Sequence, residues 1–359
     1  MRIGLIGMPK SGKTTIFNAL TGMDIEVSAY GQGESEPNQS IINVIDERIT
    51  KLSEMYNPKK TIYATIEYID FAGVNKSDKK QELMSGPGMV LLKNTDALAL
   101  VVRNFSDPVL DEMFGEFDPV MEVESMEAEM IISDMIIAEK RLEKILLSYK
   151  RGIKTPALQI EEKAINTIIE HLNAEQPLRT LELPEEEEKS IRGFQFISQK
   201  PLLLILNTDE SRYHENQEMI DAFAEKYPIV EFAGKFEAEL NSLDDEEREV
   251  FMEDMGIENS ACDTLTKYSY DILGYLSFFT VGTDEVRAWT IEKGANAVES
   301  AGKIHSDLAR GFIRAECFNY TDLINLGSEK ALRDKGLFRL EGKNYLVQDG
   351  DILNIRFNV

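Results

Sequence analysis

Residues 7–14 read Gly7-Met8-Pro9-Lys10-Ser11-Gly12-Lys13-Thr14 and match the pattern G-x-x-x-x-G-K-[ST]. Residues 2–7 are apolar enough for a short buried strand, and a helix is predicted from Lys13 to about Thr21. In such a strand, loop and helix, the glycines let backbone N–H groups turn inward around phosphate oxygens, and the helix N-terminus adds the positive end of a dipole. The stretch therefore predicts a phosphate-binding loop in an α/β fold.

Side chains of this loop and of a later strand have the chemistry for a metal-bound phosphate. The Lys13 ammonium reaches the β- and γ-phosphates as a point charge and is the predicted catalytic residue, and the Thr14 hydroxyl is a ligand for Mg²⁺. Asp70 ends a predicted strand, 61–71, where an aspartate holds Mg²⁺ through water, and the N–H of Gly73 meets the γ-phosphate. We therefore predict Mg²⁺ as cofactor, bound at Thr14 and Asp70. The predicted nucleotide-binding residues of the loop are Pro9, Lys10, Ser11, Gly12, Lys13, Thr14 and Thr15.

A second motif indicates which nucleotide base the site would recognise. The predicted strand 201–206 runs into Asn207-Thr208-Asp209-Glu210, where guanine-binding proteins have N-K-x-D. An aspartate at fixed reach accepts hydrogen bonds from guanine N1 and N2, whereas the longer Glu210, without a lysine at Thr208, blunts guanine selectivity. The motif favours relaxed or adenine-preferring binding. Val74 follows Gly73, where many GTPases have a water-positioning glutamine, so hydrolysis uses another group or is slow.

The rest of the chain predicts a sheet, a helical insertion and a smaller C-terminal region. Apolar or β-branched strands alternate with helical segments, which is typical of an α/β sheet with crossovers. Apolar residues at three- to four-residue spacing predict two helices, 121–149 and 155–172, as an inserted αα-hairpin, and the apolar repeat of the first has one eight-residue step. Residues 22–40 are predicted to be a loop. The strands predicted for the sheet are 2–7, 61–71, 96–105, 201–206 and 228–232; those of the C-terminal region are 278–281, 287–291, 345–347 and 352–357, around a helix at 297–310.

Charge is distributed unevenly along the 359 residues. The net charge of −25 argues against a protein that coats DNA by bulk charge. By predicted domain, the charge is −5 in 1–119, −5 in 120–200, −14 in 201–274 and −1 in 275–359. The last region carries a basic cluster that is either an RNA-facing patch or an ordinary solvated surface. Its members are Lys303, Arg310, Arg314, Lys330, Arg333 and Lys335.

Cysteine content and hydropathy exclude several classes of protein. Cys262 and Cys317 lie far apart and form no CxxC, which argues against a disulfide framework and against a cysteine zinc site. No apolar run approaches the roughly 20 residues that span a bilayer. We therefore expect a cytoplasmic protein with no membrane and no zinc.

These motifs resemble those of the YchF / Obg-like ATPase family, a translation-factor branch of the P-loop NTPases. The resemblance covers nearly the whole chain, and its most specific part is the C-terminus. It rests on 7–21, Asp70–Gly73, 95–97, 101–103, 207–210, 236–240, 278–280, 285–291, 311–316 and 347–359. It implies a P-loop NTPase domain in two parts (1–119 and 201–274), an inserted α-helical hairpin (120–200) and a C-terminal ubiquitin-like β-grasp (TGS) domain (275–359).

The resemblance also implies an activity, a partner and further site residues. The family binds and hydrolyses ATP in the cytoplasm and associates with ribosomes. Adenine is read near Asn207 and Thr208, Gly234 belongs to the loop that completes the base pocket, and a hydrophobic residue at Val74 is normal. The chain departs from the family at Glu34, where the family has threonine, at 75–82, which replace a Gly-rich lid, and in lacking a histidine proposed to serve hydrolysis.

Three functional hypotheses follow. The first is a slow ATPase that acts as a nucleotide switch on the ribosome, with the large subunit contacted through the TGS and helical domains. The second is a nucleotide-dependent binding module with little or no hydrolysis, and the third is a variant that binds GTP.

Overall fold

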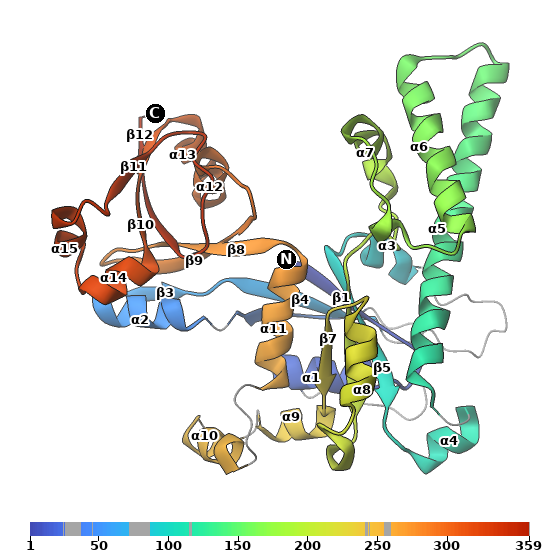
Figure 1. The fold of residues 1–359 in the computed structure, drawn as a ribbon, viewed down its shortest axis with the longest axis horizontal. Coiled ribbons are helices and arrows are strands. Elements are labelled where there is room, and N and C mark those ends of the chain that lie inside the picture. The colour runs from blue at the N-terminus through green and yellow to red at the C-terminus, as the bar shows by residue number, and fades with distance from the viewer. Residues whose placement is uncertain are drawn as a thin grey trace. The chain divides into compact units, whose positions relative to one another are not determined.

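The structure is a computed structural model of the 359-residue chain. It describes residues 1–23, 25, 37–44, 46–71, 87–114, 117–240, 243, 245–254 and 260–358 (Figure 1). The chain divides into two compact units: Met1–Ile41 with Glu67–Thr264, and Ile42–Ile66 with Leu265–Val359. The domain boundaries predicted from the sequence stay a prediction.

The first unit is built on a six-stranded sheet of order β2-β4-β1-β5-β6-β7. Its strands are β1 (Arg2–Ile6), β2 (Asn38–Asn43), β4 (Thr65–Asp70), β5 (Ala97–Asn104), β6 (Leu202–Thr208) and β7 (Ile229–Phe232). From β4 to β7 the neighbouring strands pair in parallel. Every residue of β5 and β6 is buried, as their continuous apolar runs predict. The loop after β1 leaves the carboxyl edge in the middle of this sheet, where α/β proteins bind ligands.

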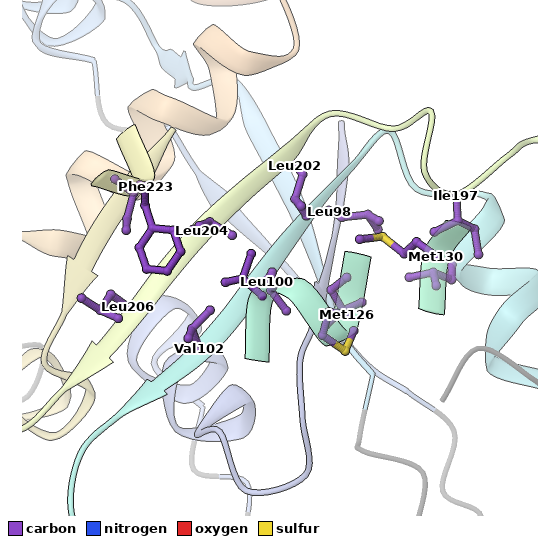
Figure 2. Close-up of a cluster of buried hydrophobic side chains, with 14 residues drawn as sticks. Leu98, Leu100, Val102, Met126, Met130, Ile197, Leu202, Leu204, Leu206 and Phe223 are labelled. Atoms are coloured by element: carbon purple, nitrogen blue, oxygen red, sulfur yellow. The ribbon is translucent and has the colours of Figure 1, made fainter. Parts of the chain in front are cut away.

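Helices cover this sheet and complete its core. Figure 2 shows leucines of β5 and β6 gathered with Met126 and Met130, which come from helix α5 (Pro119–Lys150). Alternate residues of each strand point to this face, because side chains of a strand alternate in direction. The other helices of this unit are α1 (Lys13–Thr21), α3 (Pro87–Lys93), α4 (Pro108–Phe114), α6 (Pro156–Asn173), α7 (Glu185–Ile191), α8 (Gln217–Ala224), α9 (Gly234–Leu240) and α10 (Asp245–Asp254); α11 (Ala261–Ile272) contains the boundary between the units.

The predicted αα-hairpin is present as α5 and α6, with α5 capped by Asp118 and α6 by Thr155. The eight-residue step in the apolar repeat of α5 lies between Met130 and Ala138, and Asp134 fills it. Asp134 is fully buried and accepts hydrogen bonds from the backbone N–H groups of Ile197 (2.9 Å) and Ser198 (2.7 Å). The step therefore marks the polar contact that ties the hairpin to the chain entering β6.

We expect Asp134→Ala to lower the free energy of unfolding by about 2–4 kcal/mol, because two buried N–H groups lose their acceptor. Glu143→Ala, at an exposed position of the same helix, is the control and should change stability by less than about 0.5 kcal/mol. Urea unfolding of both variants measures the difference. An equal, small loss in both would show that the Asp134 contact is not a stabilising tie.

The second unit contains a mixed sheet of order β11-β10-β12-β8-β9-β3. Its strands are β3 (Lys60–Ile62), β8 (Tyr275–Thr280), β9 (Glu285–Glu292), β10 (Phe312–Asn319), β11 (Arg339–Glu341) and β12 (Asp351–Phe357), and its helices are α2 (Glu47–Tyr56), α12 (Ala297–Ile304), α13 (Ser306–Arg310), α14 (Tyr320–Leu326) and α15 (Glu329–Asp334). Ala297 and Ala301 of α12 share one apolar core with buried residues of β8, β9, β10 and β12. A helix packed on a mixed sheet is consistent with the predicted β-grasp (TGS) fold.

Several predicted boundaries are wrong. The single strand predicted at 61–71 is two strands: β3 pairs in parallel with β9 in the second unit, and β4 pairs with β1 in the first. The segment is rich in β-branched and aromatic residues on both sides of Ala64, so propensity hardly marks the break at Tyr63 and Ala64. Residues 38–40, predicted as loop, begin β2; residues 24 and 26–36 of that loop lie outside the described residues.

Two predictions in the C-terminal region also need correction. Residues 345–347 form no strand but one isolated bridge, between Leu346 and Asn296. The helix predicted at 297–310 is broken into α12 and α13 at His305, whose ring Nδ1 accepts from the backbone N–H of Asp307 at 3.1 Å. In the described part of the chain, no helix is both long enough and apolar enough to cross a membrane.

Candidate functional site

The backbone of the loop after β1 takes conformations that few residues accept. Gly12 has φ of +94° and Lys10 has φ of +66°, a region that side chains other than glycine seldom occupy. Gly7 has φ of +148°, and a Cβ there would lie 2.4 Å from the carbonyl oxygen of Val101 in β5. The glycines of the motif thus let the loop curl tightly against the strand beside it.

Lys13 is buried under this loop, with 5% of its surface exposed. Its Nζ donates to the carbonyl oxygens of Gly7 (3.0 Å) and Met8 (2.9 Å), which leaves the third N–H for a ligand. Burial lowers the pKa of Lys13 to about 8, and the Asp70 carboxylate opposes that shift. A phosphate would compensate the cost of burying this charge.

We expect ATP affinity to fall above pH 8. Below the pKa of about 8 the ammonium is already charged in the free protein. Above it, the bound phosphate must draw a proton onto Lys13, so affinity at pH 9 should be about tenfold lower than at pH 7. Calorimetry in buffers of different ionisation enthalpy should detect the uptake of about half a proton at pH 8. Affinity independent of pH between 7 and 9 would contradict this role of Lys13.

Thr14 and Asp70 come together as the motif predicts. The Thr14 hydroxyl donates to Asp70 Oδ2 at 2.9 Å, and Asn38 Nδ2 lies 3.5 Å from the same oxygen. Asp70 is fully buried, burial raises the pKa of its carboxyl, and its Oδ1 has no hydrogen-bond partner among the described residues. A hydroxyl beside a carboxylate oxygen that lacks a donor fits the hard oxygen ligands that Mg²⁺ or its bound water prefers.

Loops after three strands meet at the start of α1. Asn207, in β6, donates from Nδ2 to the carbonyl oxygen of Ser11 at 2.9 Å. A Cβ on Gly234, after β7, would lie 3.2 Å from Cγ2 of Thr15 and 3.4 Å from Oδ1 of Asn207. The structure therefore brings together five residues that the sequence analysis assigned to nucleotide binding: Ser11, Gly12, Thr15, Asn207 and Gly234.

Thr208 and Glu210 differ in their surroundings. Thr208 is buried, and its hydroxyl accepts from Nδ2 of Asn104 at 3.2 Å; the same Nδ2 lies 3.0 Å from Oδ1 of Asn216. Glu210 is exposed at the first residue of a 3₁₀ turn. Asn104 and Asn216, which hold the loop after β6, are not predicted by the sequence motifs. A signal existed for Asn104, because it ends a strand whose first six residues are all apolar.

Of the remaining predicted site residues, the structure describes Pro9 and Lys10. Pro9 and Lys10 are half-buried in the loop. Gly73, Val74 and Glu34 lie outside the described residues, so their predicted roles remain predictions.

Comparison with known proteins identifies the family. A protein of Bacillus subtilis (strain 168) named "Ribosome-binding ATPase YchF" is 38% identical over 363 residues, which cover 99% of this chain and 99% of the relative. The chain belongs to the YchF family. A YchF protein of Escherichia coli O157:H7 with the same name is 33% identical and covers 100% of this chain and 99% of its own length. The family predicted from the sequence motifs is therefore confirmed.

Structure and sequence profiles agree with membership of the YchF family. A structure described as that of the Schizosaccharomyces pombe YchF GTPase superposes with a TM-score of 0.85 at 28% identity, covering 99% of this chain and 97% of that one. A profile described as "50S ribosome-binding GTPase" matches residues 2–141, and the YchF C-terminal profile, described as "Protein of unknown function (DUF933)", matches residues 275–358. The predicted fold class, a P-loop NTPase fold with an inserted helical hairpin and a C-terminal TGS-like region, is confirmed.

Proposed function

We propose that this protein is an ATP-binding P-loop NTPase that hydrolyses ATP slowly and acts as a nucleotide switch on the ribosome, in the cytoplasm. The observation that carries the proposal is the loop geometry around Lys13, with the Thr14 and Asp70 side chains in contact beside it. The names of the YchF relatives, ribosome-binding ATPases, support the choice of nucleotide and partner.

Each residue of the site has a proposed task. Backbone N–H groups of 10–15 and the Lys13 ammonium bind the phosphates, and Lys13 stabilises the charge that develops during transfer of the γ-phosphate. Thr14 directly and Asp70 through water would hold Mg²⁺, which supplies neutralisation of phosphate charge when bound. The Gly73 N–H is proposed to contact the γ-phosphate.

Base recognition is proposed for the loops after β6 and β7. Asn207, Thr208 and Gly234 would surround adenine, and Glu210 would disfavour guanine because its carboxylate lies on a longer side chain than the aspartate of guanine-reading motifs. The hydrogen bond from Asn207 to the loop at Ser11 supports this, since it couples the base side of the site to the phosphate side.

The ribosomal contact is proposed to lie on the large subunit. The segments proposed to make it are the helical domain, 120–200, and the TGS domain, 275–359. The two described cysteines, Cys262 and Cys317, are free thiols, which is compatible with the reducing cytoplasm.

Two measurements test the proposed function. Calorimetry with ATP, ADP, GTP and GDP should show an adenine preference, and a tenfold preference for GTP would overturn the proposed role of Glu210. Single-turnover ATP hydrolysis should be slow and should change when ribosomes are added. Binding without turnover in either condition would favour the nucleotide-dependent binding module. Three departures from the family favour that module: Glu34 in place of threonine, residues 75–82 in place of a Gly-rich lid, and the missing histidine.

A further inference from the structure

The end of the helical hairpin differs in charge from the rest of the chain. We define the tip as residues 144–160, the last turns of α5, the first turns of α6 and the segment between them. The tip carries Lys144, Lys150, Arg151 and Lys154 and no acidic residue, a net charge of +4. Because the whole chain carries −25, the residues outside the tip carry −29. The tip is therefore a concentrated positive segment on a strongly acidic protein.

The cations of the tip are available to a partner. All four are exposed, and among the described residues none of them forms an ion pair. The Lys154 ammonium lies 5.4 Å from the ring centre of Tyr149. The Tyr149 hydroxyl in turn donates to Glu162 Oε2 at 2.8 Å, which fixes the ring between the two helices. The charges are thus presented on a rigid end of the hairpin.

Apolar side chains accompany these charges. Leu146 and Leu147 are 44% and 49% exposed, and Ile153 is 55% exposed. Ile145, between Lys144 and Leu146, is fully buried and packs inside the hairpin. Exposed leucine and isoleucine beside lysine and arginine indicate a contact surface rather than a merely solvated helix end.

Geometry places this surface at the end of an arm. Asp134 holds α5 to the chain entering β6, and Lys150 ends α5 sixteen residues later, a rise of about 24 Å at 1.5 Å per residue. Figure 1 shows the link between α5 and α6 at the end of the hairpin away from the first unit's sheet. The arm can therefore reach a partner while the nucleotide loop stays accessible.

We propose that the tip binds RNA, with Lys144, Lys150, Arg151 and Lys154 on backbone phosphates and the exposed apolar side chains on ribose or base surface. This proposal rests on the ribosomal role proposed above, since it names the ribosomal component that the hairpin contacts. RNA fits because four exposed cations at the end of the hairpin outnumber the flanking carboxylates Glu143, Glu161 and Glu162, and Glu161 is already paired with Arg141. The wide, shallow minor groove of an RNA helix admits a blunt helical end.

A membrane fits the tip less well. A helix that lies on a lipid surface needs a long apolar face with basic residues along its other side. Here the charges gather around the end of two antiparallel helices, where Glu143 directly precedes Lys144 on α5 and Glu161 and Glu162 directly follow the tip on α6.

The test compares two triple variants of the full chain that change the net charge equally. The tip variant is Lys150→Glu, Arg151→Glu and Lys154→Glu, and the control is Lys140→Glu, Lys189→Glu and Lys226→Glu, all at exposed positions of the first unit. A milder variant has glutamine at the three tip positions and serves if the reversal of charge disturbs the end of α5. Circular dichroism checks that all three variants are folded. Fluorescence anisotropy uses a labelled RNA stem of about 16 base pairs, which presents two successive minor grooves.

The tip variant should bind the RNA about 100-fold more weakly near physiological salt. The number of phosphate contacts, obtained from the slope of log K against log salt concentration, should fall by about two to three. The control should lose less than about threefold, because its charges are dispersed. Equal losses in the two triples, or none in the tip variant, would overturn the proposal. A tip variant that loses binding to phosphatidylglycerol vesicles but still binds the RNA would overturn the proposal in favour of a membrane surface.

Sedimentation with purified 70S ribosomes separates this proposal from the proposed function. If the wild type and the control sediment with ribosomes and the tip variant does not, both proposals are supported. If the wild type fails to sediment with ribosomes but binds the RNA stem through the tip, the ribosomal role fails and the RNA-binding tip stands.

Discussion

Replacement of Lys13 by methionine is expected to weaken ATP binding by about 10²–10⁴-fold. The third N–H of the ammonium can form one charge-assisted hydrogen bond worth about 1.5–3 kcal/mol, and the buried positive charge also attracts both the β- and the γ-phosphate. Methionine keeps the length of the side chain without donor or charge. Calorimetric titration with ATP measures the loss. Lys10→Met, in the same loop, is the control and should cost less than about tenfold, because Lys10 is only half-buried.

Without nucleotide, the Lys13→Met variant should be no less stable than the wild type. This result separates lost binding from lost folding. Burial lowers the pKa of Lys13 to about 8, so the unfolded chain binds more protons than the folded one between pH 8 and about 10.5. The charged lysine therefore costs stability below pH 8, on the order of 3 kcal/mol, and this cost fades as the pH rises.

Methionine removes that cost but also removes two charge-assisted hydrogen bonds to carbonyl oxygens, and at about 1.5 kcal/mol each, the lower end of their range, their loss offsets the gain. Thermal unfolding at pH 7 should therefore start no lower than in the wild type, and added ATP should no longer raise the midpoint. A variant that binds ATP normally, or one that fails to fold, would contradict the role assigned to Lys13.

Local sequence predicts the phosphate side of the site because its determinants are close together in the chain. The glycines, Lys13 and the helix that begins there lie within a few residues, and α1 occupies the predicted residues 13–21. Likewise β5 and β6 follow from continuous apolar runs, since a strand buried on both faces has no polar side to show.

The features that sequence reasoning missed depend on distant partners. The split of 61–71 reflects pairing of Thr61 with Val286, and no local pattern says which of two sheets a β-branched segment will join. Asp134 looks like a gap in an apolar repeat until its donors, the backbone N–H groups of Ile197 and Ser198, are known. Asn207 reads as a base contact in the sequence, whereas the structure also gives it a hydrogen bond to the phosphate loop.

That hydrogen bond explains why position 12 needs glycine, and it predicts the second large effect. A Cβ on Gly12 would lie 2.0 Å from Nδ2 of Asn207, at a backbone φ of +94°. Gly12→Ala must therefore push Asn207 away from the Ser11 carbonyl and strain the loop. We expect it to destabilise the protein by about 2–4 kcal/mol and to reduce ATP affinity more than tenfold.

A double-mutant cycle separates the clash from the strain. Asn207→Ala removes the atom that a Cβ at position 12 would meet, so Gly12→Ala should cost about 1–2 kcal/mol less in that background than in the wild type. Gly22→Ala is the matched control, because Gly22 also has positive φ, +66°, but no atom of the described residues lies within 4 Å of the added Cβ. Its cost should be the same with or without Asn207. Strict additivity of Gly12→Ala and Asn207→Ala in urea unfolding would show that the two positions do not constrain each other. Coupling confined to the Gly12 pair would show that the base-side loop sets the shape of the phosphate loop, since the strain of a positive φ is common to both glycines.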